Sequence, residues 1–335
     1  MSDVRILGTG AYVPDRVVSN DEAAAAAGVD DAWVVSKTAI RERRWAADGE
    51  ATSDLAAAAA RAALESAGIT ADQLSVIVVA TSTPDRPQPP TASYVQQKLG
   101  ASGAAVFDVN AVCSGLVFAL SAAEGVLARR GGHALVIGAD LYSRILNPED
   151  RRTVILFGDG AGAVVLSAEG HDEARGGGVR RGARIRHIAL HSFGDCSDLI
   201  EVTGGGSRVP LDQEGLEAGL QYFTMDGRGV RSFVADNVPQ LVKEFLHEAG
   251  VVPDEIRHFV PHQANGVMLD SLFADLGLPR ATMHWTLAEY ANTGAASVPI
   301  TLDAAARAGA FSPGDLILLA GFGGGMAAGF ALLEW

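Results

Sequence analysis

Short apolar runs alternate with longer helical segments along the chain, and this alternation limits the fold more than any other feature. Six runs are short and apolar enough for buried strands, at residues 76–80, 105–107, 135–138, 163–167, 259–260 and 316–320. Five segments between or beside them have helical length, at 53–66, 114–128, 230–249, 264–276 and 295–308. We expect Thr52 or Ser53 to cap the first helix, and Gly68 and Gly250 to end two of them. The pattern predicts an α/β fold built from βαβ units, with a mostly parallel sheet covered on both faces.

The two halves of the chain resemble each other weakly. VIGAD followed by FGDGAGAVVLS in the first half, and LLAGFGGGMAAGFALL in the second, both read as an apolar strand, a glycine-rich turn and another apolar strand. A chain so rich in Gly and Ala can also produce this similarity by chance. If it reflects duplication, the boundary falls in the loop at 168–182, whose Gly- and Arg-rich part is 175–181, and the halves are 1–172 and 173–335.

The charge balance argues against several classes of partner. The chain carries 40 Asp and Glu against 26 Lys and Arg, a formal charge of −14, which repels nucleic acid and anionic lipid. The apolar stretch 104–128 includes Asp108 and Glu124, so we do not expect it to span a membrane. With two cysteines and no visible signal peptide, the sequence predicts a cytoplasmic globular protein.

The segment DVNAVCSGL contains the first candidate for chemistry. Cys113 follows a predicted strand and precedes a long apolar helix, where unpaired backbone N–H groups are expected to favour the thiolate and to hold an oxyanion. A buried structural cysteine is the alternative interpretation. Cys196, in the polar loop GDCSD, is interpreted only as structural.

Two further candidates lie in the second half. His262, in VPHQAN, is the histidine at a predicted strand-to-helix junction, and Asn292, in YANTGAAS, is surrounded by small residues. A satisfied core histidine and a helix N-cap are the respective alternatives. The turn GFGGG does not match GxGxxG because Met326 occupies the last position, so we do not expect dinucleotide binding. We also find no ligand spacing typical of a metal site.

Considered together, the three residues point to acyl chemistry. Each is expected in a turn at the end of a parallel strand, where open α/β sheets bind ligands. Cysteine, histidine and asparagine supply a nucleophile, a base or donor, and an amide donor.

The chain resembles the β-ketoacyl-acyl-carrier-protein synthase III family, the initiating condensing enzymes of the thiolase superfamily. The similarity covers nearly the whole chain: WVVSKTAIRERRW, DVNAVCSGLVFAL, FGDGAGAVVL, VPHQAN, ANTGAAS and GFGGG occur in family order and spacing. The resemblance implies a thiolase-like fold with two duplicated halves in five α-β-α-β-α layers. It also implies a homodimer that uses CoA thioesters as substrates and needs no cofactor.

The resemblance assigns roles to the residues of these motifs. Cys113 would take an acyl group from an acyl-CoA primer, and His262 and Asn292 would bind the malonyl thioester carbonyl during decarboxylation. The amides of Cys113 and Gly324 would form the oxyanion hole, and Phe322 would be an apolar wall beside the departing carboxylate.

The resemblance also implies substrate contacts. Trp33 and Arg151 would sandwich the adenine of CoA, and Asn265 would contribute to the CoA site. For Trp33 and Arg151, ordinary surface packing is the alternative. The malonyl group would arrive on a carrier protein or on CoA. The pathway would be fatty-acid biosynthesis or, as the favoured prediction, polyketide or other secondary-metabolite biosynthesis.

Two segments depart from the family. Many members narrow the acyl pocket with an aromatic residue from the partner subunit, but residues 86–90 read RPQPP, which predicts a primer larger than acetyl. The basic patch that docks an acidic carrier protein is also depleted: the usual basic positions are Ser232, Val267, Asp270 and Asp275. Either Arg228 and Arg231 have taken over docking, or the acceptor is a dedicated carrier, a CoA thioester or a small molecule.

Other functions explain the sequence less well. A papain-like protease would carry its cysteine near the N-terminus in a different motif, and a degradative thiolase would have a second catalytic cysteine in its second half. A non-enzymatic scaffold would be expected to lose one of the three residues. The strongest alternative is a family-related acyltransferase that moves an acyl group to a hydroxyl or amine without decarboxylation.

Overall fold

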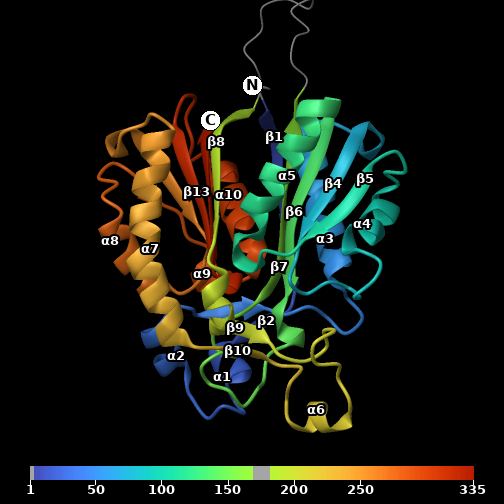
Figure 1. Cartoon of the computed structure of the whole chain (residues 1–335), viewed down its shortest axis with the longest axis vertical. Coiled ribbons are helices and arrows are strands. Elements are labelled where there is room, and N and C mark those ends of the chain that lie inside the picture. Colours follow the sequence, from blue (N-terminus) through green and yellow to red (C-terminus); the bar gives the residue numbers. More distant parts are fainter. Residues whose placement is uncertain (1–3, 169–181) are drawn as a thin grey trace, which may run out of the picture.

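Ten strands form one continuous sheet that is made of two five-stranded parts (Figure 1). The computed structural model describes residues 4–168 and 182–335. The strand order is β12-β11-β13-β14-β8-β1-β7-β6-β4-β5. The two parts meet where β1 pairs with β8 through only two residue pairs, Arg5 with Arg184 and Ile6 with Ala183.

The helices and strands have the following bounds. The strands are β1 (Arg5–Tyr12), β2 (Val17–Ser19), β3 (Glu42–Arg44), β4 (Leu74–Ala80), β5 (Ala105–Val109), β6 (His133–Leu141), β7 (Asp159–Ser167), β8 (Ala183–Ser192), β9 (Ile200–Val202), β10 (Phe223–Met225), β11 (Ile256–Pro261), β12 (Thr282–Met283), β13 (Leu316–Gly323) and β14 (Ala327–Glu334). The α-helices are α1 (Asn20–Ala23), α2 (Asp31–Thr38), α3 (Thr52–Ala67), α4 (Thr91–Leu99), α5 (Gly115–Arg130), α6 (Gln213–Glu217), α7 (Gly227–Glu248), α8 (Gly266–Asp275), α9 (Leu287–Tyr290) and α10 (Ser297–Arg307).

Side chains that alternate along the strands separate the molecule into five layers. In β4, Val76 and Val78 point into a central core with α5 and α10, whereas Ile77 and Val79 point to an outer core with α3 and α4. On the far side, β11, β13 and β14 pack against α7 and α8. Figure 1 shows α5 and α10 between the two halves of the sheet, with the α3/α4 and α7/α8 pairs outside. The expected α-β-α-β-α arrangement is confirmed.

The strand order of the two parts is the same. From the junction outwards, the first part runs β1-β7-β6-β4-β5 and the second runs β8-β14-β13-β11-β12. The weak sequence similarity between the halves therefore corresponds to a repeated topology. The boundary expected between 172 and 173, and the loop at 175–181, lie outside the described residues.

The sheet is mixed, so the expectation of a mostly parallel sheet is wrong. Parallel pairs join β4 to β5 and β6, and β11 to β12 and β13. The pairs of β1, β7, β8 and β14 are antiparallel. The βαβ argument holds only for strands that are connected by helices. Strands β7 and β14 follow β6 and β13 without an intervening α-helix and therefore run antiparallel to them.

The expected cap of α3 is also wrong. The N-cap is Ala51, because Thr52 donates its hydroxyl proton to the Thr83 carbonyl and Ser53 bonds to Asp85. Gly68 ends α3 in a left-handed conformation, as expected.

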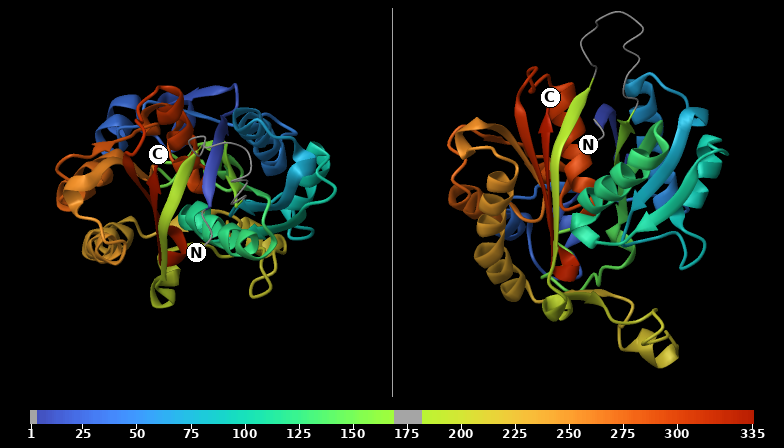
Figure 2. Two further views of the ribbon diagram at one scale, coloured as in Figure 1. Left: turned by 90° about the horizontal axis from the view of Figure 1, so that it is seen from above. Right: turned by 45° about the horizontal axis from the view of Figure 1, so that its top comes forward.

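One helix in the described part of the chain, spanning Val112–Arg130, is long and apolar enough to cross a membrane. It is the central helix α5, and its Leu116, Leu120 and Leu127 are buried in the core between the two sheets. A helix that is covered by protein on both sides is apolar all round, as a membrane-spanning helix is. Away from this core, the segment that carries α6 extends from the body of the molecule (Figure 2).

Candidate active site

Both central helices begin at one cavity. A short 3₁₀ turn precedes each of them: Val112–Ser114 before α5 and Gly294–Ala296 before α10. Cys113 lies in the first turn, and Asn292 lies just before the second. These two residues, together with His262 from the end of β11, line a cavity of about 200 Å³. The structure therefore brings the three predicted residues together from separate parts of the chain.

Cys113 is held beside the start of α5 but is not poised as a thiolate. The cysteine is buried, and burial raises the pKa of its thiol to about 12, against smaller lowering effects from the backbone N–H groups of Gly324 and of Cys113 itself. Asp140 also raises it. The expectation that the helix start would favour the thiolate is wrong, because desolvation of the sulfur outweighs the nearby amides.

The glycines of GFGGG allow the turn to lie against the nucleophile. A Cβ on Gly323, whose φ is +140°, would lie 3.3 Å from the Cys113 sulfur, and a Cβ on Gly321 would lie 2.9 Å from Ser114 Cα. This close approach brings the amides of Gly324 and Cys113 to the sulfur. Two backbone N–H groups therefore lie beside the Cys113 sulfur, which is the arrangement that the predicted oxyanion hole requires.

His262 is a buried neutral imidazole. Its Nδ1 lies 2.7 Å from the Ser297 hydroxyl at the start of α10, which leaves Nε2 for a ligand. Burial lowers the pKa of His262 to about 3. The ring of Phe322 stands edge-on to the imidazole at 5.9 Å and is itself fully buried. The bond to Ser297 agrees with a satisfied core histidine, but the cavity beside the ring gives it access to a substrate.

Asn292 does not follow a strand directly, contrary to expectation, and it is not a helix cap. It lies after α9, held by backbone bonds to Leu156 and Gly158, and α10 is capped at Ala296. Its side-chain oxygen accepts from the Gly294 N–H at 2.9 Å. This bond uses only the side-chain oxygen, so the two protons of the Asn292 side-chain NH₂ group are available to a ligand in the cavity.

The residues proposed for CoA binding lie close to this cavity. The Arg151 guanidinium stacks over the Trp33 indole at 5.9 Å, so an adenine would have to separate the pair to enter between them. Asn265 lines the cavity, but its side chain already caps α8 and donates to the Lys37 carbonyl.

Several lining residues were missed by the sequence reasoning. Three aromatic rings, Tyr142, Phe157 and Phe223, pack on one another with centroids 4.3–5.7 Å apart and form one wall of the cavity. The cationic residues Lys37, Arg152 and Arg231 also line it. Tyr142 lies two residues after VIGAD and Phe157 begins FGDG, so proximity to these motifs was the available signal.

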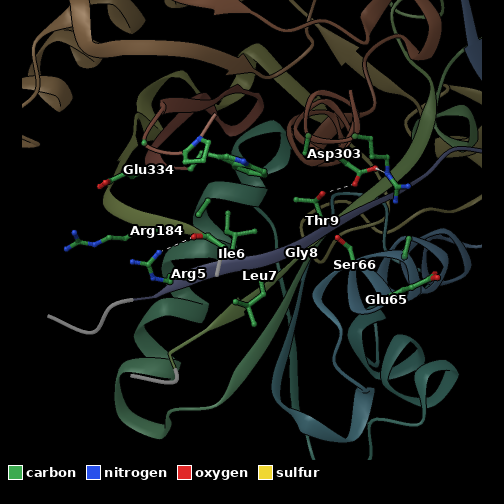
Figure 3. Close-up of a pocket in the computed structure, with 18 residues that line it drawn as sticks. Arg5, Ile6, Leu7, Gly8, Thr9, Glu65, Ser66, Arg184, Asp303 and Glu334 are labelled. Atoms are coloured by element: carbon green, nitrogen blue, oxygen red, sulfur yellow. Dashed lines mark hydrogen bonds and ion pairs between the residues drawn. The ribbon is translucent and has the colours of Figure 1, made fainter. Parts of the chain in front are cut away.

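A second, larger cleft of about 1000 Å³ lies elsewhere, between the carboxyl ends of α3 and α10 (Figure 3). Figure 3 shows Arg5 and Arg184 side by side at one end, and Thr9 bonded to Asp303 at 2.7 Å. None of Cys113, His262 and Asn292 lines this cleft. Within residues 4–168 and 182–335, no group of three His, Cys, Asp or Glu side chains could hold a metal ion.

Comparisons with known proteins give one consistent result. The family model for 3-oxoacyl-[acyl-carrier-protein (ACP)] synthase III matches residues 107–183, and the model for the C-terminal part of the same family matches residues 246–335. The chain is 68% identical to the acetoacetyl CoA synthase NphT7 of Streptomyces sp. (strain CL190), over 100% of both chains. It is 44% identical to the β-ketoacyl-[acyl-carrier-protein] synthase III of Rhizorhabdus wittichii, over 98% of each. The crystal structure of 3-oxoacyl-(acyl carrier protein) synthase III from Pseudomonas aeruginosa matches with a TM-score of 0.87 and 36% identity, over 99% of this chain and 98% of that one.

Proposed function

The chain belongs to the 3-oxoacyl-[acyl-carrier-protein] synthase III family of condensing enzymes, and from this premise we propose that it joins an acetyl group to a malonyl group, both supplied as CoA thioesters. The product would be acetoacetyl-CoA, with loss of carbon dioxide. The observation that carries this proposal is the convergence of Cys113, His262 and Asn292 on one cavity beside the amides of Cys113 and Gly324.

The first half-reaction is acyl transfer to Cys113. The sulfur attacks the acetyl carbonyl, the oxyanion is held by the amides of Cys113 and Gly324, and the bond to the CoA sulfur breaks. The thiol proton ends on the departing CoA. Because the thiol has a raised pKa in the resting enzyme, it stays protonated until a substrate is bound.

The second half-reaction is decarboxylative condensation. His262, through Nε2, and Asn292, through its amide protons, would bind the malonyl thioester carbonyl and stabilise the enolate as carbon dioxide leaves. The enolate carbon bonds to the acetyl carbon, and the bond to Cys113 breaks with its electron pair going to the sulfur. The released thiolate takes a proton from water and returns to the resting thiol. The apolar ring of Phe322 disfavours the malonyl carboxylate, which promotes its loss.

An acetyl primer is proposed from the shape of the cavity. Three mutually packed rings, Tyr142, Phe157 and Phe223, line the same cavity of about 200 Å³ as Cys113 and take up space that a longer acyl chain would need. The NphT7 relative is named an acetoacetyl CoA synthase, and an acetoacetyl product is what an acetyl primer would give in this condensation. This proposal replaces the expectation of a larger primer, which rested on the lack of an aromatic residue at 86–90 and did not take Tyr142 into account.

A CoA-bound malonyl donor is proposed from the charges around the cavity. Lys37, Arg152 and Arg231 line it and suit the phosphates of CoA, with Trp33 and Arg151 for the adenine and Asn265 alongside. The carrier-docking positions Val267, Asp270 and Asp275 carry no positive charge.

We also propose a homodimer located in the cytoplasm. Strand β5 is the outer strand of the first half of the sheet, and Ala105 is exposed while Phe107 is only partly buried. An uncovered apolar edge strand suits pairing with a second copy of the chain. The alternative function, acyl transfer to a hydroxyl or amine, would need Cys113 but no donor to a malonyl carbonyl, so the orientation of Asn292 favours condensation.

The test is to follow the two half-reactions separately. The wild type should gain one acetyl mass on Cys113 from acetyl-CoA and should release carbon dioxide and acetoacetyl-CoA when malonyl-CoA is added. Asn292→Ala should slow condensation by about a hundredfold, because a donor to the developing oxyanion contributes about 3 kcal/mol, and should leave acetylation nearly unchanged. Cys113→Ala should take up no acetyl group. Acetylation of the wild type without any malonyl decarboxylation would favour the acyltransferase alternative.

A further inference from the structure

Asp140 is a fully buried carboxylate for which the proposed reaction has no chemical role. It lies near the end of β6, has no exposed surface and does not line the active-site cavity. Burial raises its pKa to about 6, so the group is ionised at neutral pH. A buried charge is costly unless hydrogen bonds compensate it, so its partners indicate its role.

The two oxygens of Asp140 bind different parts of the chain. Oδ1 accepts from Thr81 Oγ1 at 3.2 Å, from the Ser82 N–H at 2.8 Å and hydroxyl at 3.0 Å, and from Thr83 Oγ1 at 3.1 Å. Oδ2 accepts from the Ala295 N–H at 2.8 Å. The carboxylate thus connects the loop after β4, in the first half of the fold, to the segment before α10 in the second half.

The second of these parts carries Asn292. We call residues 292–297 the Asn292 turn. Within it, the Gly294 N–H bonds to the Asn292 side-chain oxygen and Gly294 lies directly over the carboxylate: a Cβ there would be 2.3 Å from Asp140 Oδ2. Gly138, two residues before Asp140 and on the same face of β6, also contacts this turn, since its Cβ would be 2.3 Å from the Ala295 carbonyl oxygen.

We propose that Asp140 is a positioning residue for the malonyl half-reaction. It holds the Asn292 turn against β6 through the Ala295 amide, and so fixes where the Asn292 amide protons point relative to Cys113. Gly138 provides the space that this contact requires. This inference rests on the proposed condensation, in which Asn292 serves the malonyl carbonyl.

Asp159 provides a matched control. It is also fully buried and accepts three bonds, from the Ala46 N–H at 2.8 Å, the Ser143 N–H at 2.9 Å and the Ser143 hydroxyl at 2.6 Å. None of these three bonds reaches residues 292–297. The neighbouring Gly158 meets Asn292 through its backbone N–H, and replacing the Asp159 side chain leaves that backbone bond in place. The replacement should therefore cost folding stability without moving the Asn292 turn.

The experiment compares Asp140→Asn with Asp159→Asn. The asparagine at 140 can still accept at one position, but its NH₂ cannot accept from Ala295 while its oxygen serves residues 81–83. We expect Asp140→Asn to lose at least tenfold in condensation from malonyl-CoA, with no loss in the acetylation of Cys113, because removing the Asp140 charge takes away one of the effects that favour the Cys113 thiol. Asp159→Asn should change the rates of acetylation and of condensation by the same factor. Equal losses in the two steps for Asp140→Asn, an unchanged condensation rate, or the same selective loss in Asp159→Asn would overturn the proposal.

A second variant and a second measurement test the same role of Asp140. If Asp140→Asn does not fold, Gly138→Ala is the second variant. Its methyl group should push the Asn292 turn away from β6 and slow condensation selectively. A Gly138→Ala enzyme that condenses at the wild-type rate would count against the proposal. Amide hydrogen exchange of a peptide covering 292–297 should be faster in Asp140→Asn and unchanged in Asp159→Asn. This measurement does not depend on activity, so it tests the positioning role even if the wild type fails to condense acetyl and malonyl groups. Unchanged exchange in Asp140→Asn would overturn the proposal.

Discussion

At Cys113 two opposing effects act on one proton. Backbone amides at the start of α5 and in the GFGGG turn favour the thiolate, and burial together with Asp140 favours the thiol. Burial is the larger effect, so Cys113 is a protonated thiol in the resting protein. The sequence motif singled out Cys113, but it could not indicate its protonation state, because the depth of burial depends on segments far away in the chain.

The raised pKa predicts how Cys113 reacts with an alkylating agent. In a Cys196→Ala background, where Cys113 is the remaining cysteine, the rate of iodoacetamide modification should rise about tenfold per pH unit from pH 7 to pH 9. Only the thiolate reacts, and with a pKa near 12 its fraction is still increasing over this whole range. Intact mass measured against time gives the rate. A plateau reached before pH 9 would indicate a thiol with an ordinary or lowered pKa.

The positions of His262 and Asn292 differ in how far they could be predicted. His262 follows β11 directly, as the apolar run before it indicated. Asn292 is separated from β12 by α9, and its orientation is set by Leu156, Gly158 and Gly294. The contacts with Leu156 and Gly158 join segments more than a hundred residues apart, which no local pattern encodes.

Among the elements, those with continuous apolar residues were predictable and those with glycine or alternating polar residues were not. The run at 76–80 lies within β4, and the helix expected at 53–66 lies within α3. Strand β1 (ILGTGAY in its core) was missed because its glycines reduce its apolar character. Those glycines are required by packing: a Cβ on Gly10 would lie 2.3 Å from the Ala63 backbone nitrogen of α3.

A pair of glycine substitutions should therefore have opposite effects. Gly10→Ala should lower the free energy of unfolding by about 1–3 kcal/mol, because the methyl group meets helix backbone that cannot move aside. Gly125→Ala, in the exposed part of α5 with no atom within 4 Å of the new Cβ, should raise it by about 0.5–1 kcal/mol through better helix propensity. Urea denaturation followed by circular dichroism measures both. An unchanged free energy of unfolding in Gly10→Ala would contradict this expectation, since it would mean that β1 and α3 can move apart without destabilising the fold.

For the whole molecule, the repeated topology explains why one cavity receives residues from both halves. Helices α5 and α10 occupy equivalent places in the two halves, and both begin at the cavity with a 3₁₀ turn. The first of these turns holds the nucleophile and the second follows the amide donor. The sequence similarity between the halves indicated the repeat, but only the sheet order revealed that Cys113 and Asn292 precede equivalent helices.

The net charge of the molecule bears on its choice of malonyl donor. At −14, the chain as a whole repels an acidic carrier protein. The groove between α7 and α8 contains Arg231 but also Asp275 and the 42%-exposed Val267. The positive charges that line the active-site cavity, Lys37 and Arg152 together with Arg231, are better placed for the phosphates of a small thioester than for the surface of a protein.

We therefore expect turnover with malonyl-CoA to exceed turnover with malonyl loaded on a housekeeping acyl carrier protein by at least tenfold at equal concentrations. The small rate with the carrier should change little between 20 and 500 mM salt, because Ser232, Val267, Asp270 and Asp275 at the carrier-docking positions offer no positive charge whose attraction salt could screen. Arg231→Ala should weaken turnover with malonyl-CoA through KM, since its guanidinium lines the cavity without belonging to the Cys113–His262–Asn292 set. Initial rates over both donors and the salt series measure all three quantities. Efficient turnover with the carrier that falls steeply as salt rises would contradict this expectation, since it would mean that Arg228 and Arg231 support carrier docking after all.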